Sequence, residues 1–435
     1  MLRAGVVLLI GGVGSLVMTQ PSVVFAAEPP PAIYEEKDVP EYTLPDPLTM
    51  EDGRKVETAE QWKNERRPEL FKLFEEQIYG RAPAADGDVQ AEVISKVDDA
   101  LNGKATRKEV RIHLADSPHP VEMTLLMYVP NNNIPAPAFL GYNFKGNHTI
   151  TDEPDIELNS NWVRSGEGVV EHRSTEATRG TSKSRWPIEM IIDEGFAVGT
   201  IYYGDVDPDD EGRFDNGIHP AFYNEGQEQP AADEWGSIAA WAWGLSRALD
   251  YLETDDQIDG NRVAVIGHSR LGKTALWAGA TDPRFAIVIS NNSGCGGAAL
   301  SRRRFGETVL RINNMFPHWF CDNFTAYNEN EAELPVDQHE LIALIAPRPV
   351  YIASAEEDSW ADPKGEFLSA KHADPVYRLL GTDGMGGNAP PEEQPAVNDP
   401  VSSGTIGYHI RTGEHDVKDY DWEQYLKFAS RHLNK

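Results

Sequence analysis

The chain has 435 residues, of which 40% are hydrophobic and 25% charged, and its formal net charge is −31. This apolar content is ample for a folded core and excludes global disorder. The acidic composition disfavours binding to nucleic acid and to anionic membranes. The length permits one large domain or two to three ordinary ones.

The N-terminus has the pattern of an export signal. Arg3 supplies a positive charge, residues 6–17 are apolar, and Ala26 and Ala27 offer small residues for cleavage. The apolar run is short for a membrane span, so we predict a signal peptide over residues 1–27. An uncleaved anchor is the alternative. The prediction implies a secreted or periplasmic protein that has no membrane segment once the signal is removed.

The next segment is predicted to lie on the surface and to lead into a helix. Residues 28–48 contain repeated prolines and acidic residues without periodicity, which indicates an extended arm that reaches to about residue 58. Over residues 59–79, large apolar side chains recur mostly at three- and four-residue steps, which predicts a helix. Gly80 is expected to end it.

Short apolar runs follow, and each is typical of a strand. The first two are expected to pair through a proline-containing turn, and helical periodicity between later runs is clearest over residues 233–252. Apolar strands that alternate with amphipathic helices predict an α/β fold, in which a mainly parallel, doubly wound sheet lies between two helical layers. The predicted strands span residues 110–114, 123–129, 137–142, 197–203, 262–266, 286–290, 349–354 and 405–411.

Three long insertions interrupt this alternation, over residues 144–185, 205–229 and 381–404. Loops of this length in a folded domain are usually functional or mobile. In an open α/β sheet they would surround the carboxyl edge of the strands, where ligands bind. We therefore expect a single domain over residues 28–435, with the insertions around the edge where a ligand would bind.

The most informative segment follows the predicted strand 262–266. That strand ends at Gly267, Ser269 comes two residues later, and a helix-forming run begins near Lys273. A strand, a tight turn with serine at its apex and a helix form the nucleophile elbow of α/β-hydrolases. The first N–H groups of such a helix face any oxyanion that forms at the serine. Here Leu271 replaces the second glycine of the general G-x-S-x-G pattern.

The elbow string G-H-S-R-L-G-K (267–273) resembles that of the glucuronoyl esterases, carbohydrate esterase family 15, which reads G-[CH]-S-R-x-G-K. The likeness covers the chain from about residue 128 to the C-terminus and favours the bacterial branch of the family. It implies an α/β-hydrolase fold and esterase activity. Further shared motifs are S-N-N-S-G-C-G-G (290–297), R-R-F-G-E (303–307), H-W-F-C (318–321), L-P-V-D-Q-H (334–339), A-E-E-D-S-W-A-D-P (355–363) and G-E-H-D (413–416).

A serine nucleophile needs a base and an orienting carboxylate, which in this fold follow in the order serine, acid, histidine. His415 lies in a loop beyond the last predicted strand, and the resemblance also marks it, so we predict it as the base. His409 lies within that strand and is expected to be structural, whereas His268 is expected to pack beside the turn. Several carboxylates follow the strand 349–354, and the resemblance selects Asp358. Fungal members keep a glutamate after the preceding strand instead, where this chain has no carboxylate.

Four further residues are expected to act at the site. Arg270 follows the nucleophile, and its backbone N–H and guanidinium are expected to stabilise the oxyanion. The alternative is a surface arginine that pairs with an acid. The resemblance implies that Lys273, Glu307 and Trp360 bind the glucuronate ring. The alternatives are a solvated helix surface for the lysine, a partner of neighbouring arginines for the glutamate and a place in the core for the tryptophan.

The chain has only two cysteines, Cys295 and Cys321, which can form a disulfide in an exported protein. The sequence does not reveal whether their side chains face each other. No cysteine or histidine partner stands at the spacing of a zinc site, so we expect no metal and no organic cofactor.

The resemblance implies a secreted serine esterase that cleaves esters of glucuronic or 4-O-methylglucuronic acid, such as lignin–carbohydrate ester links on glucuronoxylan. Ser269, His415 and Asp358 would form an acyl-enzyme by the triad mechanism. A monomer suffices for this activity. An acetyl-xylan or other carbohydrate esterase is the first alternative, and a non-catalytic glycan-binding protein on a hydrolase fold is the second.

Overall fold

The computed structural model describes residues 30–84, 89–116, 118–132 and 134–433. The predicted signal peptide, residues 1–27, lies outside this range. The chain divides into two units after Pro31, and the described helices and strands belong to the second unit, Ala32–Lys435. No helix within the described residues is both long and apolar enough to cross a bilayer.

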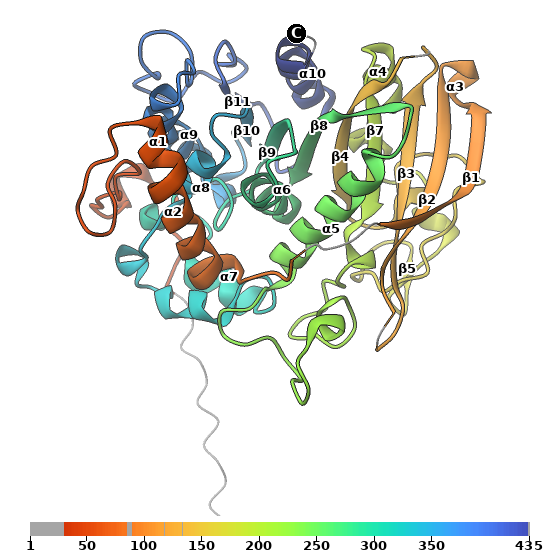
Figure 1. The fold of residues 1–435 in the computed structure, drawn as a ribbon, viewed down its shortest axis with the longest axis horizontal. Coiled ribbons are helices and arrows are strands. Elements are labelled where there is room, and N and C mark those ends of the chain that lie inside the picture. The colour runs from red at the N-terminus through yellow and green to blue at the C-terminus, as the bar shows by residue number, and fades with distance from the viewer. Residues whose placement is uncertain (1–29, 85–88, 117, 133, 434–435) are drawn as a thin grey trace, which may run out of the picture. The chain divides into compact units, whose positions relative to one another are not determined.

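Nine strands form one sheet in the spatial order β1-β2-β3-β7-β4-β8-β9-β10-β11 (Figure 1). The strands from β7 to β11 in this order are parallel, and β1, β2 and β3 add an antiparallel extension at the other edge. The predicted mainly parallel sheet is thus confirmed. The strands are β1 Gln90–Asp99, β2 Ala105–Ala115, β3 Val121–Pro130, β4 Ala136–Asn143, β7 Ala197–Tyr202, β8 Ile258–His268, β9 Ile287–Asn291, β10 Val350–Ala355 and β11 Ile406–Arg411.

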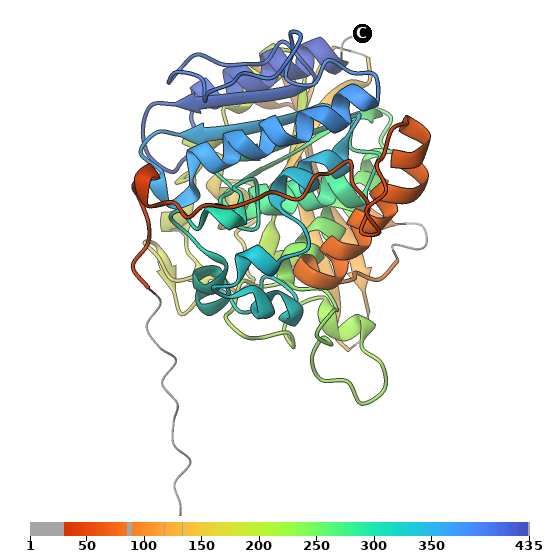
Figure 2. The same cartoon turned by 90° about the vertical axis from the view of Figure 1, so that its left-hand side faces the viewer.

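Helices cover both faces of the sheet and enclose two apolar cores. Alternate residues of β3 point to the two sides, with Leu125 and Met127 in one core and Leu126 and Tyr128 in the other. This arrangement confirms the three-layer α/β-hydrolase fold. The first core is covered by α2 (Arg67–Phe74), α5 (Ser237–Leu252), α6 (Arg270–Thr281), α8 (Gln338–Ile345) and α9 (Pro363–Leu379), and the second by α4 (Ile188–Asp193) and α10 (Asp419–Leu433). Figure 2 shows α9 and α10 on opposite sides of the β10–β11 edge.

The predicted helix over residues 59–79 is present but is not a uniform α-helix. It consists of α1 (Ala59–Gln61) and α2, each followed by a π-helical turn. Thr58 begins it with a capping box, because its side chain accepts from the Gln61 backbone while the Gln61 side chain accepts from the Thr58 backbone. Gly80 ends it with φ 83°, and a Cβ at Gly80 would meet the Glu234 carbonyl oxygen at 2.1 Å.

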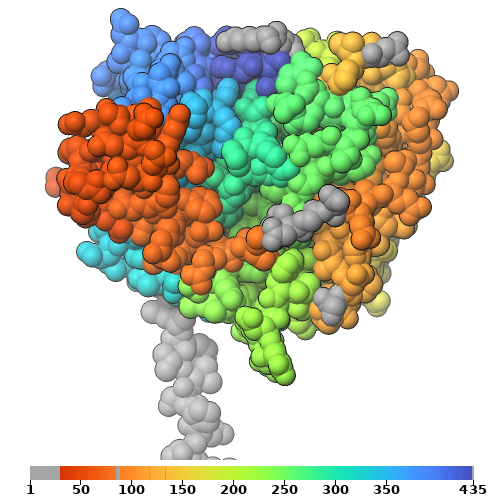
Figure 3. Space-filling model, viewed as in Figure 1, coloured from red at the N-terminus to blue at the C-terminus, as the bar shows by residue number. Residues whose placement is uncertain are grey.

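The N-terminal arm lies on the outer surface of this unit (Figure 3). Ile33 forms an isolated parallel bridge with Phe305, and Glu36 pairs with both Arg303 and Lys364. These contacts hold the arm against the segment that precedes Glu307, which is one of the residues expected at the active site. The described part of the arm is therefore attached to the folded unit at Arg303, Phe305 and Lys364.

The structure also contains elements that the sequence pattern did not predict. These include β1, the helices α8, α9 and α10, and a short ribbon in the first insertion formed by β5 (Val169–Val170) and β6 (Arg173–Ser174). The small helical segments α3 (Ala100–Gly103) and α7 (Val309–Met315) are further additions. Each predicted strand is present, and several extend beyond the apolar run that indicated them, as β8 does.

Candidate active site

The serine at the end of β8 lies in a strained bend. Ser269 joins β8 to α6 with φ 58° and ψ −129°, a conformation that residues with side chains rarely adopt. Gly267 permits the bend, because a Cβ there would meet the Leu271 carbonyl oxygen at 1.8 Å. Ser269 is half-buried at the carboxyl edge of the sheet. This is the geometry that the elbow motif predicts.

The departure from G-x-S-x-G follows from how α6 packs. Leu271 occupies the position of the second glycine and is buried in the core. The glycine stands one position later, where a Cβ on Gly272 would lie only 3.0 Å from Ser293 Cβ and 3.2 Å from the Asn291 carbonyl oxygen. The first turn of α6 thus packs tightly against the end of β9. Its leading N–H groups have no acceptor within the helix and remain suited to an oxyanion.

His415 and Asp358 come together at the neighbouring strand ends. His415 Nδ1 donates to Asp358 Oδ2 at 2.6 Å, from the loop after β11 to the loop after β10. The His415 side chain is 40% exposed, whereas Asp358 is buried. Burial disfavours the charge of Asp358, but the hydrogen bond and charge of His415 outweigh it and hold the pKa of that carboxyl below its usual value.

Asn292, the residue after β9, binds the same carboxylate. Its Nδ2 donates to Asp358 Oδ2 at 2.9 Å, and both side chains are buried. Asn292 falls in the segment where the resemblance implies a glutamate in fungal members. In this chain the residue at this position does not supply the carboxylate. Its amide instead donates a hydrogen bond to Asp358, which follows β10.

His415 also lies beside the nucleophile bend. Its ring centroid is 4.5 Å from that of His268, the residue that precedes Ser269. Within the described residues, no hydrogen bond joins Ser269 Oγ to His415. Catalytic hydrogen bonds are often long or poorly aligned before substrate binds. The lack of a Ser269–His415 hydrogen bond is therefore compatible with proton transfer in a substrate complex. The three triad candidates therefore converge at one edge of the sheet.

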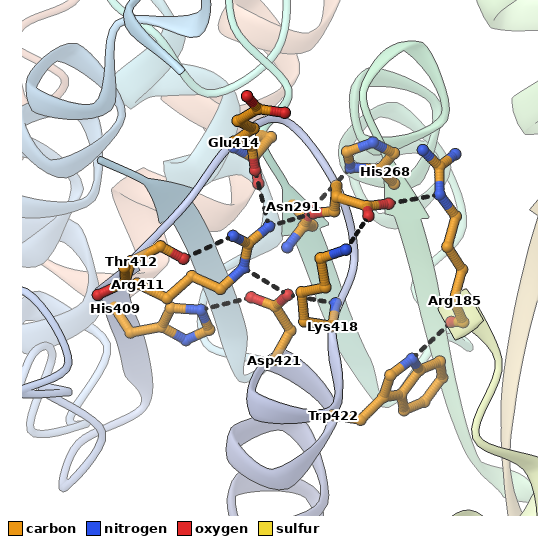
Figure 4. A network of polar contacts seen from close by, with 12 residues as sticks. Arg185, His268, Asn291, His409, Arg411, Thr412, Glu414, Lys418, Asp421 and Trp422 are labelled. Atoms are coloured by element: carbon orange, nitrogen blue, oxygen red, sulfur yellow. Dashed lines mark hydrogen bonds and ion pairs between the residues drawn. The ribbon is translucent and has the colours of Figure 1, made fainter. Parts of the chain in front are cut away.

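Arg411 fixes the loop that carries His415 (Figure 4). Its guanidinium donates to the backbone carbonyls of Thr412, Glu414 and Asp416, at 3.0, 3.2 and 2.5 Å. Its Nε donates to Asp421 Oδ2 at 2.8 Å, and Arg411 is almost fully buried. One side chain thus ties the loop on both sides of His415 to the start of α10.

Arg270 is not free at the surface. Its Nη1 contacts Asp209 Oδ2, and its guanidinium carbon lies 4.7 Å from the ring centroid of Trp319. Asp209 comes from the second insertion and also binds Arg164 of the first, at 3.0 Å. The guanidinium is thus held against an aromatic surface next to Ser269, with 18% of the side chain exposed. Arg270 does pair with an acid, as the alternative expected, but it does so beside the nucleophile.

Asp209 is the centre of this cluster. Its Oδ1 accepts from His318 Nε2 and from Trp319 Nε1, each at 2.8 Å, and Tyr203 donates to its Oδ2 at 2.9 Å. Burial disfavours its charge, but the hydrogen bond from His318 and the charge of Arg270 outweigh it and keep the pKa of Asp209 below its usual value. Asp209 is therefore ionised and can hold Arg270 in place.

Lys273, Glu307 and Trp360 also lie near one another. Lys273 Nζ is 3.5 Å from Glu307 Oε2 and donates to the Ser293 carbonyl oxygen at 2.5 Å. The Glu307 amide donates to the Trp360 carbonyl oxygen at 3.0 Å. Lys273 and Glu307 are buried and Trp360 is half-buried. The alternatives of a solvated lysine and of a glutamate paired with its arginine neighbours do not fit, because these two side chains pair with each other.

His409 and His268, which were expected to be structural, are both buried and hydrogen-bonded. His409 is buried in β11, where Asp421 and Tyr351 contact its two ring nitrogens. His268 Nδ1 contacts Asn291 Oδ1 at 2.6 Å, and burial and the neighbouring His415 lower the pKa of His268 well below its usual value. The uncharged His268 imidazole thus packs beside His415, the predicted base.

The possible disulfide is not formed, because Cys295 and Cys321 are both free and buried. The thiol of Cys321 instead points to the Glu76 carbonyl oxygen, 3.8 Å away at the end of the first helical segment. Burial raises the pKa of both thiols, which makes them unreactive. The described residues contain no group of three or more histidine, cysteine, aspartate or glutamate side chains placed to hold a metal ion.

Sequence analysis missed Asp209, Arg164, Asn292 as a partner of the acid, and Arg411. Asp209 stands in a loop with five other acids over residues 205–215, so no local pattern separates it from them. A signal existed for Arg411, since arginine is rare in a buried strand and must find partners there.

Comparisons with known proteins relate the chain to the glucuronoyl esterases. A family model described as "Glucuronyl esterase, fungi" matches residues 188–381. The carbohydrate esterase MZ0003 of an unknown prokaryotic organism is 52% identical over 416 residues, which cover 94% of this chain and 93% of that protein. A 4-O-methyl-glucuronoyl methylesterase of Schizophyllum commune is 27% identical over 78% of this chain and 74% of its own length.

Solved structures of esterases from the same family are also similar to this chain. The glucuronoyl esterase from Solibacter usitatus is 47% identical, with a TM-score of 0.86 over 91% of this chain and 99% of that one. An esterase from a marine bacterial metagenome, described as promiscuous and as a member of carbohydrate esterase family 15, is 52% identical. Its TM-score is 0.85, over 92% of this chain and all of that one.

Proposed function

The chain belongs to carbohydrate esterase family 15, the glucuronoyl esterases, and is a carboxylic ester hydrolase; from this premise we propose that it cleaves esters of glucuronic and 4-O-methylglucuronic acid with Ser269, His415 and Asp358. The observation that carries the proposal is the 2.6 Å contact between His415 and Asp358, beside the strained bend at Ser269. A buried, ionised acid that orients an exposed imidazole at a serine elbow is the arrangement that acyl transfer needs.

In the first half of the reaction, His415 Nε2 takes the proton of Ser269 Oγ as that oxygen attacks the C6 carbonyl carbon of the ester. The carbonyl oxygen becomes an oxyanion, which the first amides of α6 and the Arg270 guanidinium stabilise. The C–O bond to the alcohol then breaks, and His415 gives its proton to the leaving oxygen. The products of this half are the free alcohol and a glucuronoyl ester of Ser269.

In the second half, water replaces the alcohol. His415 takes a proton from water, which attacks the acyl carbon, and returns the proton to Ser269 Oγ as the serine leaves. Asp358 keeps the imidazole oriented and stabilises its positive charge in both halves. The charges of the site suit this mechanism, because the Arg270 guanidinium stabilises the developing anion and Asp358 stabilises the developing imidazolium.

The sugar ring is proposed to lie over Lys273, Glu307 and Trp360. The lysine and glutamate are 3.5 Å apart and offer a donor and an acceptor to adjacent hydroxyl groups. The half-buried indole offers an apolar platform for the ring. Because Lys273 and Glu307 are already paired and buried, they need little reorganisation to bind a neutral sugar ester.

The alcohol side of the ester is proposed to extend toward solvent. His415 is 40% exposed, so the leaving group that it protonates lies at the open face of the site. This opening suits a large alcohol, such as a lignin fragment attached to glucuronoxylan. We further propose that the enzyme is exported with residues 1–27 removed, that residues 28–435 form one catalytic domain, and that it acts as a monomer without a metal or organic cofactor.

The test is release of benzyl alcohol from benzyl glucuronate. Wild-type enzyme should release it, Ser269→Ala should lose at least about 10³-fold in kcat, and the exposed control Ser160→Ala should keep full activity. Acetylated xylan, assayed beside methyl glucuronate, separates the proposal from an acetyl esterase. Faster turnover of the acetate, or equal turnover by Ser269→Ala, would refute the proposed function.

A further inference from the structure

Two guanidinium groups share one buried carboxylate beside the nucleophile. Arg270 Nη1 and Arg164 Nη1 both contact Asp209 Oδ2. Because they contact the same oxygen atom, the two guanidinium groups are close neighbours. Two positive charges and one negative charge leave a net positive charge, and we call these three residues the arginine pair cluster.

Within the described part of the chain, Asp209 is the acid that pairs with these two arginines. Asp209 is fully buried, and its Oδ1 is already engaged by His318 and Trp319. Arg270 Nε is buried and has no hydrogen-bond partner among the described residues. Aromatic rings rather than carboxylates cover the guanidinium of Arg270, which lies over Trp319 and Phe316. The cluster thus retains a positive charge and unused N–H donors.

Arg164 is the more exposed of the two arginines, whereas Arg270 follows the nucleophile directly in the chain. The Arg164 side chain is 41% exposed, against 18% for Arg270, and its guanidinium carbon lies 5.3 Å from the Phe316 ring centroid. Arg164 comes from the first insertion and has no place in the Ser269, His415 and Asp358 mechanism. The mechanism does not explain why Arg164 lies beside Arg270, the arginine proposed to stabilise the oxyanion.

We propose that the arginine pair cluster binds the carboxylate of the released uronate, so that Arg164 sets the strength of product inhibition. The inference rests on the proposed function, because its ligand is the acid that ester hydrolysis releases. The substrate carries a neutral ester at C6, whereas the product carries a full negative charge on the same carbon. A planar carboxylate matches the fork geometry of guanidinium donors, so a cationic cluster at this point favours product over substrate.

Because the whole chain is strongly acidic, binding of a uronate anion requires local positive charges. With a formal net charge of −31, the protein repels small anions at long range. Salt screens that repulsion beyond about 10 Å at 0.1 M, while a direct contact with a partly buried guanidinium is screened less. Uronate binding should therefore depend on the two arginines and not on the general field of the protein.

The first experiment measures inhibition of benzyl glucuronate hydrolysis by sodium glucuronate. Arg164→Gln should raise the inhibition constant about tenfold or more, because it removes a charge-assisted bond to the product. The KM for the neutral ester should change less than about threefold. The inhibition constant of Arg164→Lys should lie between those of the wild type and Arg164→Gln. The matched control is Arg213→Gln, whose arginine lies in the second insertion, pairs with Asp210 and Asp215, and is 53% exposed.

Two kinetic results would overturn the inference. One is an inhibition constant in Arg164→Gln that matches the value in Arg213→Gln. The other is an ester KM that rises as much as the inhibition constant, since that result assigns Arg164 to general substrate binding. Melting temperatures of the variants are measured alongside, and Arg164→Lys keeps the test valid if the glutamine variant is unstable.

The second experiment separates this inference from the proposed function. Titration calorimetry follows glucuronate binding to Ser269→Ala and to the double variant Ser269→Ala/Arg164→Gln, with methyl glucoside as the neutral ligand. Loss of glucuronate binding in the double variant supports the inference whether or not the wild type hydrolyses the ester. Equal binding to both variants, or binding to neither, overturns it even if the esterase is active.

Discussion

Asn292 Nδ2 and His415 Nδ1 contact the same oxygen of Asp358, at 2.9 and 2.6 Å. The amide of Asn292, which follows β9, therefore binds the carboxylate of Asp358 in the loop after β10. The donor pair keeps the acid ionised despite its burial. In this chain the strand next to the nucleophile supplies support for the acid instead of the acid itself.

This relationship predicts the effect of Asn292→Ala. Removing one donor raises the pKa of Asp358, whose ionised form orients His415, so the acid limb of the kcat/KM profile should move to higher pH. We expect kcat to fall about tenfold at neutral pH, because one hydrogen bond to a charged group is worth ~1.5–3 kcal/mol and only part of it acts in the transition state. A pH–rate profile of benzyl glucuronate hydrolysis checks this. An unshifted acid limb would show that Asn292 does not act on Asp358.

Asp358→Asn should be far more damaging. The amide presents no charge to the imidazolium and favours the wrong tautomer of His415, which in related triads costs about 10⁴-fold in kcat. Stopped assays over long times measure the residual rate. A loss below about tenfold would point to another carboxylate as the acid, with Glu356 and Glu357 as the nearest candidates in sequence.

Arg411→Gln should lower kcat more than it changes KM for the ester. The substitution frees the carbonyls of Thr412, Glu414 and Asp416, so the loop that carries His415 loses its fixed geometry. We expect a loss of about 10²-fold in kcat, the effect of a catalytic group displaced by about 1 Å. Arg411→Lys should recover part of the rate. The exposed Arg431→Gln is the control, and an equal effect of both substitutions would contradict this role.

Gly267→Ala should abolish the native elbow. A Cβ would lie 1.8 Å from the Leu271 carbonyl oxygen, a backbone atom that can move only if α6 shifts. We expect a loss of at least ~3 kcal/mol in the free energy of unfolding, or no soluble protein. Gly166→Ala, where a Cβ has no neighbour within 4 Å, is the matched control. Thermal denaturation compares the two variants with the wild type.

Glu366 predicts a pH dependence of stability. Burial raises the pKa of this α9 carboxyl to about 8, although it accepts from Ser354 and from the backbone amides of Ser293 and Gly294. The folded protein then binds more protons than the unfolded chain between the ordinary glutamate pKa and about pH 8. Stability should therefore fall as pH rises through that window. Glu366→Gln keeps one acceptor for the two amides and should flatten the fall in melting temperature between pH 5 and pH 8.

The sheet could be predicted because its parallel strands are buried on both faces and read as apolar runs. β1 was missed for the opposite physical reason. Its sequence, Q-A-E-V-I-S-K-V-D-D, carries charges on both faces, since it lies at the sheet edge with most residues exposed. Its pairing with β2 is set by tertiary neighbours and not by its own pattern.

The triad candidates were predictable because each falls at a strand end with a distinct motif. Asp209 was not, because its importance comes from burial between two insertions, and the sequence around it consists of similar acids. The sequence left the disulfide open, because cysteine parity carries no information on distance. In the fold, both cysteines are free and buried.

The two halves of the site have different origins in the chain. The proposed triad residues follow the ends of strands, and the buried Arg411 holds the loop of His415. Arg164 and Asp209, in contrast, lie in the insertions. Exchange of the first insertion between relatives would therefore alter how the enzyme tolerates accumulated acid, while Asp209 of the second insertion would keep Arg270 in place. That separation offers a route to engineering tolerance of released acid independently of turnover rate.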